Sequence, residues 1–135
     1  MNTVQTPYGF GVQLDLPFEQ AIAKVTGLLK EQGFGVLTEI DVQKTLREKL
    51  GADFRRYVIL GACNPQLAHR AFQAELEIGL LLPCNVVVHE EGAGSVVAFV
   101  DPNAAMSVVG NPALEPIARE ARQRLEKVRD QLAGR

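Results

Sequence analysis

The spacing of apolar residues predicts alternating strands and helices along the chain. Residues 10–14 alternate between apolar and polar positions, as a half-buried strand does. From Asp15 to Gly33, apolar residues recur three and four positions apart, which predicts an amphipathic helix. Asp15 is the predicted cap of this helix, with Pro17 in its first turn, and Gly33 suits the left-handed position at its end.

The middle of the chain repeats this pattern in shorter segments. Residues 34–40 are a predicted strand, and Asp41 is a predicted cap for the short helix that follows. Residues 54–63 predict a long third strand, and Asn64-Pro65 is a second combination of cap and proline that starts a helix.

The last third of the chain predicts a hairpin and a long helix. Residues 78–82 are too short a run to assign, whereas residues 84–89 and 95–100 are predicted strands joined by a glycine-rich turn. A final helix is predicted to start near Asn111-Pro112. It has apolar residues alternately four and three positions apart, at Leu114, Ala118, Ala121, Leu125, Val128 and Leu132. This stripe lasts less than three heptads, so it favours a helix docked on a sheet over a coiled coil.

This order of elements predicts one domain over residues 1–135, with an α+β two-layer sandwich fold. The predicted sheet is mostly antiparallel and five-stranded, with two long helices on one face and two short helices inserted. Residues 57–60, 86–88 and 96–100 are apolar at consecutive positions, so we expect both faces of the sheet to be covered. The short helices, a ligand or a second copy of the chain could cover the second face, and a homodimer is the economical interpretation.

Composition and charge narrow the classes of partner. Hydrophobic residues make up 47% of the 135 residues and charged residues 22%, as in ordinary globular domains. The net charge is −2 and no lysine or arginine cluster is present, which argues against nucleic acid as a partner. The amino terminus does not resemble a signal peptide and no apolar run is long enough to span a membrane. We therefore expect a cytoplasmic protein with reduced thiols and no membrane partner.

Three segments that follow one another along the chain resemble a known protein family: residues 33–42, residues 57–65 and residues 78–86. With this spacing they resemble the bacterial family known as domain of unknown function number 302. The resemblance spans nearly the whole chain and implies a compact α+β fold of the TATA-binding-protein-like class, together with a tendency to dimerise. It implies no established activity.

The two cysteines are the first candidates for chemistry. Cys63 precedes Asn64 at the end of one predicted strand, and Cys84 precedes Asn85 at the start of the next. Four interpretations are possible. The cysteines could be buried structural thiols, contacts to a ligand or metal, a redox pair, or a disulfide that closes a loop of about 20 residues. The Cys-x-x-Cys spacing of a redox pair is absent, and the two histidines complete no standard zinc pattern.

Polar residues near strand ends form a second group of candidates. Glu39 shares a strand face with Asp41, so the two could act as paired carboxylates, although Asp41 is also the predicted helix cap. Arg55 and Tyr57 share a face of the third strand. The alternative interpretation of these residues is that charged strand ends simply meet solvent or one another.

The leading hypothesis is a homodimeric, non-catalytic module that binds a small molecule or a metal. Its candidate ligand-binding residues are Cys63, Asn64, Cys84, Asn85, Glu39, Arg55 and Tyr57, and any metal would be held by Cys63 and Cys84. A thiol-dependent redox enzyme that uses either cysteine, and a purely structural dimeric adaptor, are the alternatives. The sequence identifies no cofactor.

Overall fold

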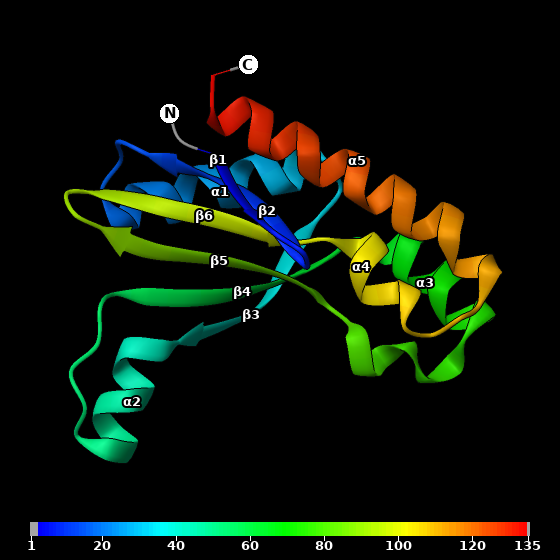
Figure 1. Ribbon diagram of the computed structural model, residues 1–135, viewed down its shortest axis with the longest axis horizontal. Helices are drawn as coiled ribbons and strands as arrows, with labels where there is room; N and C mark the ends of the chain where they lie inside the picture. The colour runs from blue at the N-terminus through cyan, green and yellow to red at the C-terminus, as the bar shows by residue number, and fades with distance from the viewer. Residues whose placement is uncertain (1–2, 135) are drawn as a thin grey trace.

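The computed structural model describes residues 3–134 of the chain. Its strands are β1 (Thr3–Thr6), β2 (Gly9–Leu14), β3 (Gly35–Asp41), β4 (Tyr57–Cys63), β5 (Cys84–Glu91) and β6 (Gly94–Val100) (Figure 1). Its α-helices are α1 (Phe18–Glu31), α2 (Val42–Leu50), α3 (Pro65–Ala74), α4 (Pro102–Ser107) and α5 (Glu115–Leu132). Two short 3-10 helices, η1 (Leu76–Leu81) and η2 (Pro112–Leu114), precede β5 and α5.

The strands of residues 3–134 form one six-stranded sheet in the order β1-β2-β6-β5-β4-β3. Each neighbouring pair is antiparallel. The predicted α+β class is therefore confirmed, but the predicted number of five strands is wrong. The additional strand is β1, a short, largely polar edge strand that pairs with β2. Its residues carry little apolar signal, because backbone pairing rather than burial determines this strand.

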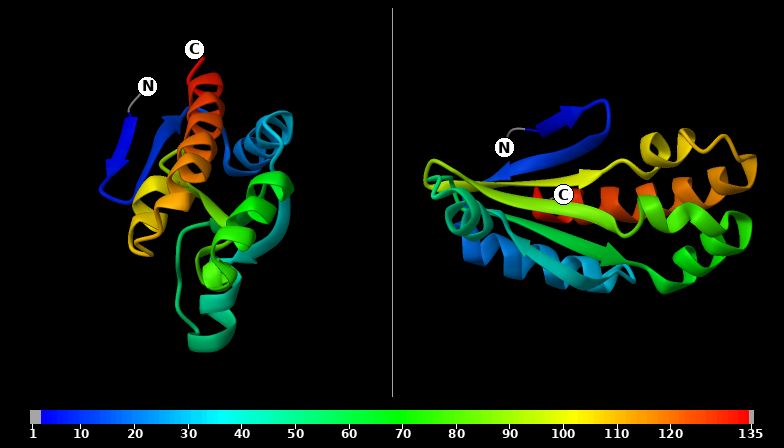
Figure 2. Two further views of the ribbon diagram at one scale, coloured as in Figure 1. Left: turned by 90° about the vertical axis from the view of Figure 1, so that its right-hand side faces the viewer. Right: turned by 90° about the horizontal axis from the view of Figure 1, so that it is seen from below.

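Helices α1 and α5 pack on one face of the sheet (Figure 2). Each contributes one apolar stripe to the main core, at Ala21, Val25 and Leu29 in α1 and at Leu125, Val128 and Leu132 in α5. The sheet contributes alternate residues of its central strands, among them Phe10, Leu60, Val86, Val88 and Phe99. The two stripes read from the sequence are thus the surfaces that hold the sandwich together.

The predicted helix starts at Asp41 and Asn64 agree with the structure, whereas the predicted start at Asp15 does not. The Lys44 N–H donates a 2.9 Å hydrogen bond to Asp41 Oδ1, and Asn64 caps α3 in the same way, so both predicted caps are confirmed. Asp15, by contrast, is not the cap of α1. That helix begins at Phe18, after an extended Pro17 in the cap position that makes no side-chain cap bond.

A second, smaller core lies beyond one end of the sheet. Residues of α3, η1, α4, η2 and α5 build it, with Leu67, Ile78, Met106, Leu114 and Ile117 among its buried side chains. Helix α4 was not expected from the sequence, which predicted no helix between the strand at 95–100 and the helix near Asn111-Pro112. The long helix α5 belongs to both cores, so it fixes the small helices relative to the sheet (Figure 1).

Within residues 3–134, the other face of the sheet carries no helix (Figures 1 and 2). One row of paired positions crosses all six strands there and consists of Val4, Gly11, Ala98, Val87, Ile59 and Ile40. The large side chains of this row are half-buried or exposed, and Ile40 is 50% exposed. We call this surface the open face. That a ligand or a second copy of the chain covers this face stays a prediction.

Candidate functional site

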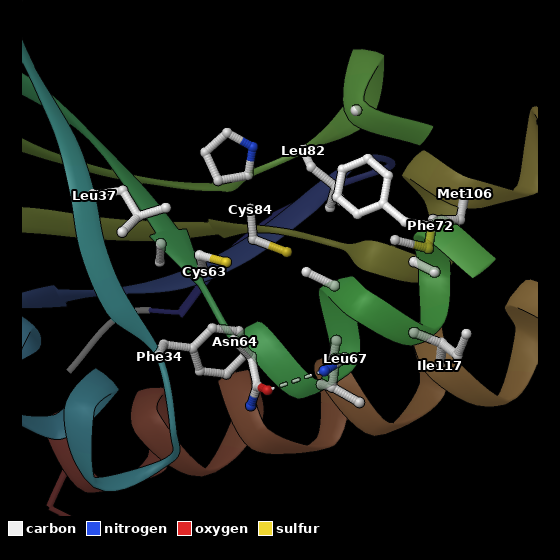
Figure 3. Close-up of a pocket in the computed structure, with 16 residues that line it drawn as sticks. Phe34, Leu37, Cys63, Asn64, Leu67, Phe72, Leu82, Cys84, Met106 and Ile117 are labelled. Atoms are coloured by element: carbon white, nitrogen blue, oxygen red, sulfur yellow. Dashed lines mark hydrogen bonds between the residues drawn. The ribbon is translucent and has the colours of Figure 1, made fainter. Parts of the chain in front are cut away.

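An apolar pocket lies where the end of the sheet meets the small core (Figure 3). Its cavity volume is about 250 Å³. Both cysteines line it, so we call it the thiol pocket. Other lining residues include Phe34, Leu37, Asn64, Leu67, Phe72, Leu82, Met106 and Ile117.

The first wall of the thiol pocket forms where β4 ends and α3 begins, and residues at this junction determine its geometry. Strand β4 ends at Cys63, and the chain turns directly into α3 because Asn64 caps that helix and Pro65 occupies its first position. The Leu67 N–H donates to Asn64 Oδ1 at 3.2 Å (Figure 3). This short turn places both Cys63 and Leu67 in the lining of one cavity.

The second thiol comes from the neighbouring strand. Cys84 begins β5 and is paired with Ala62, the residue before Cys63. Both cysteines are free and half-buried, and both sulfur atoms point into the thiol pocket (Figure 3). The sheet therefore brings together two residues that are separated by the whole of α3 and η1.

Burial raises the pKa of the Cys84 thiol to about 11, and the neighbouring Cys63 adds to this rise. Cys84 is therefore a neutral thiol near pH 7. A reactive cysteine requires a lowered pKa, because the thiolate is the nucleophile. Cys84 thus has the properties of a weakly polar wall residue.

The lining of the thiol pocket is almost entirely apolar. Among the described residues that line it, none is charged. Asn64 supplies a side-chain amide, and its oxygen is already engaged in capping α3. The pocket is therefore suited to bind an apolar molecule, and its two thiols can make weak polar contacts with that molecule.

The remaining predicted site residues lie outside this pocket. Asn85 is exposed and faces Gly61 in the ladder between β4 and β5, so no buried amide needs a partner there. Glu39 is exposed on the edge strand β3. Neither side chain is brought to the two thiols.

Arg55 and Tyr57 lie at the opposite end of β4 from Cys63. Arg55 donates to the Glu91 carboxylate at 2.9 Å and to the Glu90 carbonyl at 3.0 Å, across to β5. The Tyr57 ring stacks on His89 with centroids 5.2 Å apart and planes 6° apart. The predicted residues thus fall into separate groups, of which only Cys63, Asn64 and Cys84 share a cavity.

A conventional metal centre does not form in the described part of the chain. Residues 3–134 contain no group of three or more histidine, cysteine or acidic side chains that could hold an ion. His69 is exposed on α3, and His89 is engaged with Tyr57 at the far end of the sheet. Any ion at the two thiols would have to accept a low coordination number.

Sequence reasoning missed the wall that comes from the helices. Met106 of α4 and Ile117 of α5 line the thiol pocket, yet both belong to elements remote from the cysteines in the chain. One available signal was the small side chains Ala68 and Ala71 on the apolar side of α3, which leave room against the sheet. Apolar periodicity alone does not distinguish a filled contact from a cavity.

The fold and the site together define an α+β sandwich protein with an apolar, thiol-bearing pocket beyond one end of its sheet. Residues 10–132 match the family described as "Domain of unknown function DUF302", and the chain belongs to this family. The resemblance inferred from the three sequence segments is thereby confirmed.

A solved structure supports both the family and the fold. The crystal structure of an uncharacterized conserved DUF302 protein from Bacillus stearothermophilus is 33% identical in sequence, with a TM-score of 0.86. The match covers 93% of this chain and 98% of that one. A comparison with curated proteins gave no match. In residues 3–134, no helix has the length and apolar character needed to cross a membrane.

Proposed function

We propose that this protein is a non-catalytic binding module that takes a small, neutral, apolar molecule into the thiol pocket. The observation that carries the proposal is a cavity of about 250 Å³ whose described lining contains no charged residue. An apolar cavity of about 150 Å³ takes up benzene, whereas pockets for drug-sized ligands start near 300 Å³. A single or fused aromatic ring, or a short alkyl chain, therefore matches the available space.

The chemistry of the thiols favours binding over catalysis. The raised pKa of Cys84 keeps its thiol protonated near neutral pH, which opposes a thiol-dependent redox enzyme that uses this residue. Neutral thiols make favourable contacts with aromatic rings and alkyl groups. A purely structural adaptor would not need a cavity at this position, because close packing is the ordinary state of a protein interior.

Isothermal titration with indole, a neutral apolar probe, tests this proposal. Ala68 and Ala71 line the thiol pocket on α3, so Ala68→Leu and Ala71→Leu each fill part of the cavity. Ala23→Leu on the exposed side of α1 is the matched control. We expect indole to bind the wild type and the control alike and to bind both filled variants at least about tenfold more weakly. Equal affinity in all four proteins, or no binding by the wild type, would contradict the proposal.

We further propose that the protein is a homodimer that pairs through the open face. The row of apolar positions across the six strands supports this, since it carries no charged residue. Five strand spacings of about 4.8 Å and strands about 20 Å long give a flat area of roughly 500 Å². Because side chains project from this plane, the accessible area of the face is larger than its flat area and approaches the roughly 800 Å² that each partner buries in a standard interface.

A second copy is the occupant that this geometry favours. Two sheets pack face to face about 10 Å apart, and a symmetric pair presents the same apolar row from both sides. Exposed apolar side chains also occur in and just after α2, where Leu50 is 75% exposed and Phe54 is 42% exposed. A symmetric partner could cover these residues together with Ile40.

Sedimentation velocity at micromolar concentration tests the dimer. The wild type should sediment as a dimer, and Val87→Asp in the middle of the open face should sediment as a monomer, because it places a charge in the interface. Ala23→Asp on the exposed side of α1 should remain dimeric. A monomeric wild type, or a dimeric Val87→Asp variant that is folded, would contradict the interface.

A further inference from the structure

The wall of the thiol pocket formed by β4 and β5 brings two free sulfur ligands together. Cys63 and Cys84 come from neighbouring antiparallel strands, one residue out of register, since Cys84 pairs with Ala62. Both sulfur atoms point into the same cavity, and each thiol is close enough to influence the other electrostatically (Figure 3). Among the lining residues that the structure describes there is no carboxylate or imidazole.

We propose that Cys63 and Cys84 form a two-coordinate site for a soft, monovalent d10 cation, of which Cu⁺ and Ag⁺ are the examples. Thiolates select such ions over hard cations. Zinc does not suit the site, because it requires four ligands and the described residues offer two at this place. The apolar surroundings limit access of water as a further ligand, which also favours a low coordination number.

Binding at this site is a ligand exchange without oxidation or reduction. Each S–H bond gives its proton to solvent, and each sulfur forms one bond to the cation. One ion therefore releases two protons and leaves one net negative charge on the complex. Cys63 directly precedes Asn64, the cap of α3, so the positive end of that helix dipole lies next to the charge.

This inference does not rest on the proposed function. The cation needs only the two sulfur atoms of the wall made by the two strands, whatever occupies the rest of the thiol pocket. Met106 carries a third sulfur that lines the pocket from α4, on the side of Phe72 (Figure 3). The proposed site does not include this thioether, so Met106→Leu tests whether the site is two-coordinate, and Ala23→Leu on the exposed side of α1 is the control.

The test is calorimetric titration of the fully reduced protein with Ag⁺, which is inert to redox change, in buffers of different ionisation enthalpy. We expect one ion per chain and two protons released per ion. Cys63→Ser and Cys84→Ser should each weaken binding by more than the roughly 100-fold that loss of an outer-shell partner costs. Met106→Leu should bind as the wild type does. Indole titration of the same serine variants is a separate readout of the proposed function.

Several results would overturn the site. These are two ions per chain with one proton each, one ion shared by two chains, or wild-type affinity in either serine variant. If a serine variant fails to fold, alkylation of the wild type decides instead. One equivalent of Ag⁺ should then protect both thiols together in native protein, and protection of one thiol alone would contradict the proposal.

Discussion

Asn64 Oδ1 accepts a 3.2 Å hydrogen bond from the Leu67 N–H, and this cap joins two walls of the thiol pocket. Cys63, in the wall formed by the sheet, directly precedes Asn64, while Leu67 stands in the wall formed by α3. Asn64 is itself buried, with 7% of its surface exposed. The bond therefore fixes both the start of a helix and the shape of the cavity.

Removal of this cap should destabilise the protein. We expect Asn64→Ala to lower the free energy of unfolding by about 1–2 kcal/mol, because the Leu67 N–H loses its partner at a buried site. Asn64→Asp retains a cap oxygen and should lose less. Urea denaturation measures both, with Asn103→Ala on the exposed side of α4 as the control. An alanine variant as stable as the aspartate variant would show that the cap contributes nothing.

The close approach of β2 and β6 requires a residue without a side chain. A Cβ atom at Gly11 would lie 2.1 Å from the Val97 carbonyl oxygen and 2.7 Å from Ala98 Cα. Both are backbone atoms that cannot rotate away, so Gly11→Ala should cost about 2 kcal/mol or more. Gly35→Ala in β3 meets nothing within 4 Å and should change stability by less than about 1 kcal/mol. Thermal unfolding of the two variants should separate them clearly, and equal melting temperatures would contradict the observed strand spacing.

Asp101 performs two tasks that substitution can separate. Its Oδ1 accepts a 2.9 Å hydrogen bond from the Asn103 N–H and so caps α4, and its Oδ2 pairs with Arg122 of α5. Asp101→Asn retains a capping oxygen but loses the charge, whereas Asp101→Ala loses both. We expect the alanine variant to be less stable than the asparagine variant by about 1 kcal/mol in chemical denaturation. An asparagine variant no more stable than the alanine variant would show that the cap is dispensable.

The raised pKa of the Cys84 thiol predicts loss of stability at alkaline pH. Its pKa rises from an ordinary value of 9.0 to about 11 in the folded protein. Because the neutral thiol is favoured by folding, its contribution is complete below pH 9 and is lost as pH rises toward 11. One pKa unit corresponds to about 1.4 kcal/mol, so about 2 kcal/mol should disappear by pH 11.

Comparison with Cys84→Ala isolates this effect from other groups that titrate in the same range. The difference in unfolding free energy between wild type and variant should shrink by about 2 kcal/mol from pH 8 to pH 11. A difference that stays constant over this interval would mean that the protein does not raise the pKa of Cys84.

Much of the fold could be predicted because its signals are local. The stripes of α1 and α5 and the caps Asp41 and Asn64 each depend on residues within a few positions of one another. Strand β1 could not be predicted in this way, since its pairing with β2 rather than its side chains makes it a strand. The predicted cap at Asp15 was wrong because the chain stays extended through Pro17, so α1 begins at Phe18.

The candidate site was predictable only in part. The Cys-Asn pairs indicated Cys63, Asn64 and Cys84, because they flank the turns between strand and helix. The same reasoning also selected Asn85, which the alternation of β5 turns toward solvent. Met106 and Ile117 line the thiol pocket only because α4 and α5 pack against α3. The sequence around the cysteines contains no pattern that predicts this packing.

Methyl NMR during an indole titration tests the central claim most directly, because it reports where a small apolar molecule binds. The methyl groups of Leu67 and Met106 line the thiol pocket, whereas those of Leu132 lie in the main core between sheet and helices. We predict saturable shifts at Leu67 and Met106, with Leu132 unchanged. No shift at the pocket methyls, or equal shifts at all three residues, would contradict a ligand site between the two cysteines and the small core.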